Sequence, residues 1–107
     1  MSFELLWVII RPEKKPEALQ RLESEGFYAL TEMRVYGRGK QRGVQVGSAT
    51  YDELAKTLLL LAVEEDRCQQ AIQAIQEAAH TGQPGDGKIF VQPVGQVLTV
   101  RTGKPER

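Results

Sequence analysis

Apolar positions along the chain fall into short runs whose length and composition are typical of strands. The first, ELLWVIIR at 4–11, is a continuous apolar run rich in β-branched residues. The run TLLLLAV at 57–63 predicts a strand that is buried on both faces. FYALTEMRVYG at 27–37 alternates loosely, and KIFV at 88–91 fits a buried strand. QVLTVR at 96–101 predicts a short final strand or an extension.

Two segments between these runs show helical periodicity. In 12–26 the prolines suit a first helical turn, and Gly26 ends a stripe formed by Ala18, Leu19 and Leu22. A second helix follows Asp66, which is a candidate N-cap. Its apolar positions recur at helical spacing: Cys68, Ile72, Ile75 and Ala79.

The order of these elements is β-α-β-loop-β-α-β, which predicts an α+β, ferredoxin-like βαββαβ fold. That fold serves many unrelated functions, so the function has to be argued from sites. The connection at 37–55 has about 19 residues, where a hairpin needs about two to five. Glycines and polar residues dominate it and no periodicity is visible, so we expect a long functional loop.

Composition limits the class of protein. The 107 residues fit a single domain, 1–107, with a modest core that oligomerisation often completes. Its 14 basic residues equal its 14 acidic ones, which argues against a nucleic-acid partner. The single cysteine excludes an internal disulfide and suits a reducing compartment. No apolar run reaches the roughly 18 residues of a membrane span, and no signal peptide is recognisable. We therefore expect a soluble cytoplasmic protein.

The stretch TGQPGDGK at 81–88 is the first candidate site. Its glycines let backbone N–H groups approach an anion, and Lys88 adds a charge suited to phosphate. Asp86 has the wrong sign for phosphate but can accept a hydrogen bond from a hydroxyl or orient Lys88. The spacing is not that of a Walker A loop, and a strand follows instead of a helix. A tight turn with a glycine helix cap is the structural alternative.

Three further cationic features each have two interpretations. The segment 34–43 carries four cations and fits either a solvated loop or an RNA-binding patch, although Tyr36 is its only aromatic residue. Lys56, between a polar loop and an apolar strand, either extends to water or meets a bound carboxylate. Arg101 ends an apolar stretch and either begins a frayed tail or binds a ligand.

Catalytic residues are not evident. His80 lies at the predicted C-terminus of a helix, where a partly cationic ring favours the helix dipole. Cys68 lies on the apolar stripe of that helix and fits the core. No second histidine or cysteine is available for a metal site, and no nucleophile–base pair can be assembled. The prediction is a protein that is not an enzyme, with a small phosphate-ester or acyl-phosphate hydrolase as the alternative.

Several of these motifs resemble those of the PII signal-transduction proteins. TGQPGDGKIFVQPV followed by VRTGK is similar to the family's TGxxGDGKIFVxPV…RTGE signature. LTEMRVYGRGKQRG resembles the entry to the family's T-loop, and the spelling GRGKQRGVQVG is most similar to the branch that regulates nitrogenase. The resemblance covers nearly the whole chain. It implies a compact homotrimer with a T-loop at about 37–55, a B-loop at 81–88 and a C-terminal loop at 101–107.

The resemblance also implies ligands and roles for individual residues. It implies that ATP, ADP or AMP binds in clefts between subunits, and that the T-loop, ordered by a small anion, regulates a target protein. The effector positions are Lys56, which pairs with a 2-oxoglutarate carboxylate, and Gln41, which helps to hold Mg²⁺ when ATP and 2-oxoglutarate bind together. The matching nucleotide positions are Gly37, Arg38, Gly85, Asp86, Gly87, Lys88 and Arg101.

The chain departs from the family pattern at several positions. Thr99 replaces an arginine that grips phosphate, which favours ADP or AMP over ATP. Val35 replaces a glycine, and Ala55 replaces a proline before Lys56. The T-loop is rewritten, and Tyr51 does not align with the tyrosine that some members uridylylate.

Two regulatory functions therefore stay open at this stage. One is a regulator of nitrogen metabolism, whose target is a nitrogenase component or a transporter. The other is a sensor of inorganic carbon that binds bicarbonate and acts on a carbon-metabolism protein.

Overall fold

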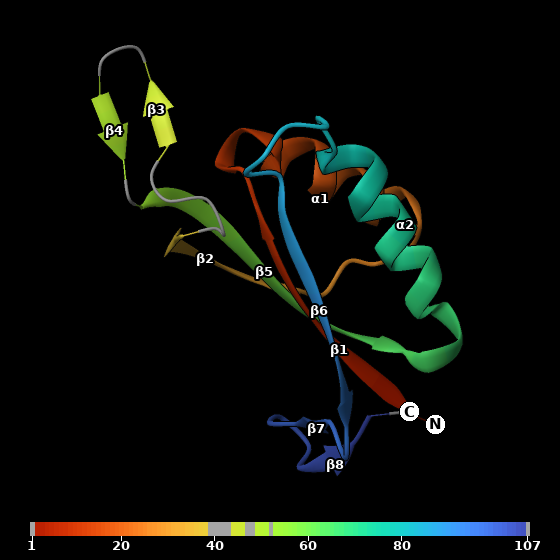
Figure 1. Cartoon of the computed structure of the whole chain (residues 1–107). Coiled ribbons are helices and arrows are strands. Elements are labelled where there is room, and N and C mark those ends of the chain that lie inside the picture. The colour runs from red at the N-terminus through yellow and green to blue at the C-terminus, as the bar shows by residue number, and fades with distance from the viewer. Residues whose placement is uncertain (1, 39–43, 47–48, 52, 107) are drawn as a thin grey trace.

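A computed structural model describes residues 2–38, 44–46, 49–51 and 53–106 (Figure 1). Four strands form one antiparallel sheet in the order β2-β5-β1-β6: β1 (Phe3–Ile10), β2 (Thr31–Gly37), β5 (Leu54–Glu64) and β6 (Gly87–Val94). Two helices, α1 (Lys15–Ser24) and α2 (Cys68–Ala79), lie on one face of it. Each follows a 3₁₀ turn, η1 (Pro12–Lys14) or η2 (Glu65–Arg67). The predicted ferredoxin-like βαββαβ order is confirmed.

The core lies between the sheet and the two helices. Side chains alternate between the faces of a strand, so Leu6, Val8 and Ile10 of β1 all point toward the helices and are at most 3% exposed. Leu22 of α1 and Ile75 of α2 complete this layer. Cys68 is buried in it, as predicted, and burial raises the pKa of its thiol.

The opposite face of the sheet carries no helix in the described part of the chain, although it is rich in apolar side chains. By the same alternation Trp7, Met33 and Phe90 belong to this open face, and their exposed fractions are 37%, 53% and 52%. A solvent-facing sheet normally alternates between apolar and polar residues. The open face is therefore suited to packing against another surface.

Two small hairpins extend the sheet at opposite ends (Figure 1). The hairpin of β3 (Val44–Val46) and β4 (Ala49–Tyr51) lies beyond the ends of β2 and β5, within the long connection. The hairpin of β7 (Leu98–Thr99) and β8 (Lys104–Pro105) follows the far end of β6. The four-stranded sheet thus has one hairpin at each end.

Several predicted boundaries were wrong. The strand expected at 27–37 begins at Thr31, because Phe27 is buried as part of a turn that packs on the core. The connection at 37–55 contains a hairpin and ends early, since β5 already begins at Leu54.

Other elements also differ from the prediction. Asp66 lies inside η2, and α2 begins without a side-chain cap. The strand expected at 88–91 extends to Val94, and within 96–101 only Leu98–Thr99 is a strand.

Candidate functional site

The glycine-rich B-loop is built where β6 begins. Gly82, Gly85 and Gly87 all have positive φ angles, of 88°, 96° and 119°, which side chains disfavour. At Gly87 a Cβ atom would lie 1.8 Å from the carbonyl oxygen of Ile9, inside the backbone of β1. Gly87 therefore allows β6 to start directly beside β1, as the pairing of Ile10 with Gly87 requires.

Asp86 closes the loop from within. Its Oδ2 accepts hydrogen bonds from the amides of Thr81 and Gly82, each at 2.9 Å, and its Oδ1 accepts from the Thr81 hydroxyl. These bonds from Thr81 are the main reason that the pKa of Asp86 lies far below its ordinary value. Both carboxylate oxygens are thus used inside the loop, so Asp86 fixes the shape of the B-loop.

Arg11, at the end of β1, holds the same loop from outside. Its Nε donates to Asp86 Oδ1 at 3.1 Å, and its Nη2 donates to the carbonyl oxygen of Pro84 at 2.8 Å. Arg11 was not predicted as a site residue, because it ends an apolar run 75 positions before Asp86. One feature of the sequence could have pointed to Arg11. The alternation of side chains along β1 places it on the same face as Trp7 and Ile9, just beyond the end of the strand.

Lys56 makes a third link to the loop. Its ammonium donates to the carbonyl oxygen of Gly85, and the residue is only 8% exposed. The interpretation of Lys56 as a lysine extending to water was therefore wrong. Burial, and secondly the charge of Arg11, lowers the pKa of Lys56 below its ordinary value. Gly37 leaves room for this side chain, because a Cβ there would lie 3.3 Å from Lys56 Cγ.

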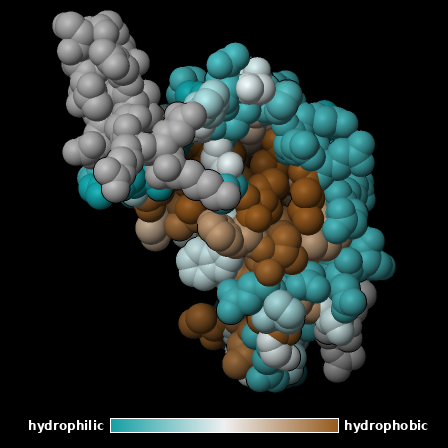
Figure 2. Space-filling view, viewed as in Figure 1, coloured by the Kyte–Doolittle hydropathy of each residue, from teal (hydrophilic) through white to brown (hydrophobic). Residues whose placement is uncertain are grey.

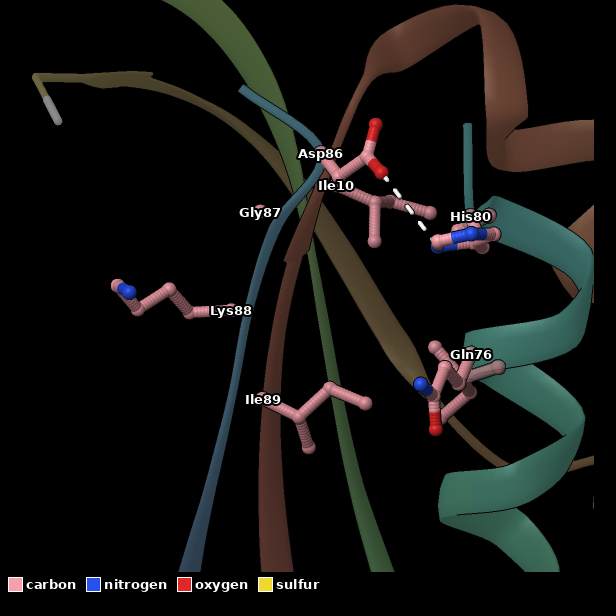
Figure 3. Close-up of a pocket in the computed structure, with 9 residues that line it drawn as sticks. Ile10, Gln76, His80, Asp86, Gly87, Lys88 and Ile89 are labelled. Atoms are coloured by element: carbon pink, nitrogen blue, oxygen red, sulfur yellow. Dashed lines mark ion pairs between the residues drawn. The ribbon is translucent and has the colours of Figure 1, made fainter. Parts of the chain in front are cut away.

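Lys88 and Arg38 are two further cations at this end of the sheet. Lys88 pairs with Ile9, and its exposed side chain points away from α2 toward the open face (Figure 3). Arg38 lies at the base of the T-loop, where its Nη2 donates to Glu53 Oε1 at 3.2 Å. The structure thus brings Gly37, Arg38 and Lys56 to the same end of the sheet as the B-loop.

A pocket of about 220 Å³ lies behind the B-loop, between β6 and α2. Ile10, Ile89 and Gln76 line it, and apolar surface surrounds it (Figures 2 and 3). His80 ends α2 as predicted, with Nδ1 3.8 Å from Asp86 Oδ2. Because its floor is apolar and Lys88 points the other way, this pocket is not suited to phosphate.

Arg101 is not brought to the B-loop. It lies in the turn of the β7–β8 hairpin, at the far end of β6 (Figure 1). The eight residues of β6 alone span about 23 Å at about 3.3 Å per residue. Near Arg101, the Thr99 hydroxyl donates to Glu106 Oε2 at 2.8 Å. The predicted phosphate contacts are therefore divided between the two ends of the sheet.

One predicted site residue has no described position. Gln41 lies outside the described residues. Within the described ranges, no cluster of three or more histidine, cysteine, aspartate or glutamate side chains is suited to a metal ion. Neither helix of the described chain is long and apolar enough to cross a membrane.

Comparisons with known proteins agree with this geometry. The family model described as nitrogen regulatory protein P-II matches residues 3–104. The chain belongs to the PII family. A relative from Methanosarcina barkeri, "Nitrogen fixation nifHD1 region GlnB-like protein 1", is 48% identical over 102 residues, which cover 95% of this chain and 97% of the relative. The corresponding nifHD-region protein of Methanothermococcus thermolithotrophicus is 44% identical, covering 94% of this chain and 96% of the relative.

A solved PII structure shares the fold. The crystal structure of Arabidopsis thaliana PII bound to citrate superposes with a TM-score of 0.81 at 32% identity, covering 98% of this chain and 89% of that one. The predicted resemblance to PII proteins of the nitrogen-fixation branch is thus confirmed, and the protein is a PII-family signal-transduction protein.

Proposed function

We propose that this PII chain forms a homotrimer that binds an adenine nucleotide in each cleft between subunits. A small anion then acts with the nucleotide on the T-loop, which regulates a target protein of nitrogen fixation without catalysing a reaction. The proposal rests on the separation between the two cations that are expected to bind phosphate. Lys88 and Arg101 lie at opposite ends of one sheet, so one phosphate chain can meet both only if they come from different subunits.

The open face of the sheet supports the assembly. Trp7, Met33 and Phe90 are large apolar side chains left half exposed on it. Packing three such faces against one another would remove them from water, at about 25 cal/mol per Å² of apolar area. A closed ring with cyclic symmetry also gives every B-loop the same neighbouring hairpin.

The B-loop supports nucleotide binding. Glycine backbone in positive φ exposes N–H groups to phosphate oxygens, and Lys88 supplies a positive charge beside them. At the other side of the cleft Thr99 is bonded to Glu106, where the family has an arginine. A hydroxyl beside a carboxylate attracts phosphate less than a guanidinium does. We therefore expect ADP or AMP to compete well with ATP.

Lys56 supports the binding of an anionic effector at the base of the T-loop. It is a buried lysine whose ammonium bonds the Gly85 carbonyl, while Arg11 beside it is already paired with Asp86. The related Arabidopsis protein was solved with citrate, a carboxylate. We propose that a carboxylate such as that of 2-oxoglutarate pairs with the Lys56 ammonium, with Gln41 as the partner for Mg²⁺ when ATP is bound.

The names of the relatives support a target in nitrogen fixation. The relatives from Methanosarcina barkeri and Methanothermococcus thermolithotrophicus are described as GlnB-like proteins of nitrogen fixation regions. We propose a nitrogenase component as the target, with the T-loop as the contact.

Mixing two defective chains tests the cleft assignment. Lys88→Ala and Arg101→Ala chains, carrying different tags, are refolded together, and mixed trimers are isolated and titrated with ADP. Each variant alone should bind weakly. In every mixed trimer one cleft would combine an intact Lys88 with an intact Arg101 from the neighbouring chain, so binding should partly return. Mixed trimers that stay as weak as the separate variants would exclude an intersubunit site.

Wild-type protein provides the second control. A trimer that binds none of ATP, ADP and AMP would contradict the nucleotide assignment itself. Hydrolysis of a bound nucleotide by the pure trimer would instead favour the hydrolase alternative.

A further inference from the structure

The carbonyl groups of the B-loop are held in one direction by two cations from other strands. Arg11 Nη2 bonds the carbonyl oxygen of Pro84 at 2.8 Å, and Lys56 bonds that of Gly85. A trans peptide is planar, so each carbonyl points opposite to the N–H of the next residue. The amides of Gly85 and Asp86 therefore point away from Arg11 and Lys56. The Gly85 amide meets no acceptor within the described part of the chain, whereas the Asp86 amide faces the Gln83 carbonyl across the turn formed by Pro84 and Gly85.

A backbone amide that points outward from a glycine-rich turn can donate a hydrogen bond to an anion. The two bonds from Arg11, to Asp86 and to Pro84, fix both the closing carboxylate and the first carbonyl of this turn. The side chains of Arg11 and Asp86 are only 22% and 25% exposed, so the pair is partly shielded from water. Arg11 therefore lies on one side of the turn, and the Gly85 amide points to the opposite side.

We propose that Arg11 is a positioning residue that aims the amide of Gly85 at the nucleotide phosphates without touching the nucleotide. This inference rests on the proposed nucleotide binding. The affinity of the cleft for the nucleotide should therefore depend on Arg11, which lies outside the B-loop and acts through its contact with Asp86.

The first test uses ligand-free protein. Amide hydrogen exchange is measured for wild type, Arg11→Gln, Arg11→Lys and Asp86→Asn, with Arg21→Gln as the matched control. Arg21 is also an arginine paired with a carboxylate, Glu77, at 2.6 Å, but it lies between the two helices. Arg11→Gln and Asp86→Asn should accelerate exchange at Thr81 and Gly82 by at least about tenfold, the equivalent of one charge-assisted hydrogen bond. Arg21→Gln should leave these amides unchanged.

The second test is calorimetry with ADP. Arg11→Gln should raise the dissociation constant about tenfold, and the double variant with Asp86→Asn should be no weaker than the weaker single variant, because both act on one structure. Arg11→Lys should recover part of the affinity, since a lysine can keep the ion pair with Asp86 but cannot also bond Pro84.

The outcomes separate the possible roles. Weak ADP binding by Arg11→Gln with unchanged loop exchange, and with effects that add to those of Asp86→Asn, would make Arg11 a direct ligand contact and overturn the proposal. Unchanged exchange and unchanged affinity would overturn it as well. Should the wild type bind no nucleotide, the proposed function fails, and the exchange data still decide whether Arg11 holds the loop. Should Arg11→Gln not fold, Arg11→Lys and Asp86→Asn provide the same comparison.

Discussion

The two ends of β6 are built in different ways. At its start, side chains from β1 and β5 reach the B-loop over long sequence separations, through Arg11 and Lys56. At its far end, the β7–β8 hairpin is held by local bonds, such as Gly103 N–H to the Thr99 carbonyl at 2.7 Å. Val100, in the turn of that hairpin, is 99% exposed.

This difference indicates how the proposed cleft between subunits would be assembled. The B-loop is shaped by its own chain before any ligand arrives, so little ordering entropy remains to oppose binding there. The hairpin has few contacts with its own domain, and an apolar side chain such as Val100 gains burial only against another chain. We infer that one side of the cleft is preformed and that assembly orders the other.

The largest expected effect is at the preformed end. Gly87→Ala would place a Cβ 1.8 Å from the Ile9 carbonyl oxygen at a φ of 119°, so β6 must move away from β1. The steric and backbone costs together should destabilise the fold by at least about 3 kcal/mol. Urea unfolding measures the change. Gly95→Ala, just after β6 and with no atom near its Cβ position, is the matched control. Equal losses in both variants would contradict the assigned close approach.

The next largest effect is expected on nucleotide binding, which we assign to one cation at each end of β6. Lys88→Ala and Arg101→Ala should each weaken nucleotide binding by about 1.5–3 kcal/mol, the size of a charge-assisted contact, and leave the trimer intact. Calorimetry with ATP and ADP measures the affinity, and light scattering checks the assembly. Arg21→Ala controls for the loss of a surface arginine. Unchanged affinity in both variants would be incompatible with the proposed cleft.

The sequence predicted the glycine-rich turn at the start of β6, but not the side chains that hold it. The glycines of the stretch 81–88 predicted a tight turn, which the positive φ angles of Gly82, Gly85 and Gly87 confirm, because a glycine pattern is local information. What holds the turn was not predictable in the same way, since Arg11 and Lys56 meet it only after β1, β5 and β6 pair. A charged residue that ends an apolar run gives no hint of a partner so distant in the chain.

The strand boundaries failed for a related reason. Phe27 was assigned to a strand because it begins an apolar alternation, but it is buried in a turn, with the Arg67 guanidinium 4.2 Å from the centre of its ring. The hairpin inside 37–55 was also missed, because its two strands have only three residues each. The pattern of apolar runs nevertheless predicted the order of the main strands and helices correctly.

A smaller effect is expected at the locally built end. Thr99→Arg would replace a hydroxyl bonded to Glu106 by a guanidinium that can reach a phosphate, or pair with that carboxylate. We expect ATP affinity to rise by about 1 kcal/mol and AMP affinity to change less, because ATP carries more phosphate charge. Calorimetry with both nucleotides measures the ratio. Thr102→Arg, in the same hairpin, controls for added charge, and an equal gain for ATP and AMP would show that position 99 does not face the phosphates.

The smallest expected effect is the pH dependence of stability that Lys56 gives to the preformed end. Burial lowers the pKa of Lys56 in the folded chain below its ordinary value of 10.5. Between the folded pKa and 10.5 the unfolded chain binds this proton more strongly than the folded chain, so stability rises with pH in that window. Below the window both states are protonated, and the cost of burying the charge is constant.

Lys56→Met removes this pH-dependent contribution to the free energy of unfolding, so the stability of the wild type relative to the variant should rise as the pH approaches 10.5 from below. Urea unfolding at several alkaline pH values measures the difference, with Lys104→Met, in the β7–β8 hairpin, as the control for lost charge. A difference between wild type and Lys56→Met that stays constant with pH would mean that Lys56 is as well solvated in the folded protein as in the unfolded chain, and that the preformed end does not depend on a buried lysine.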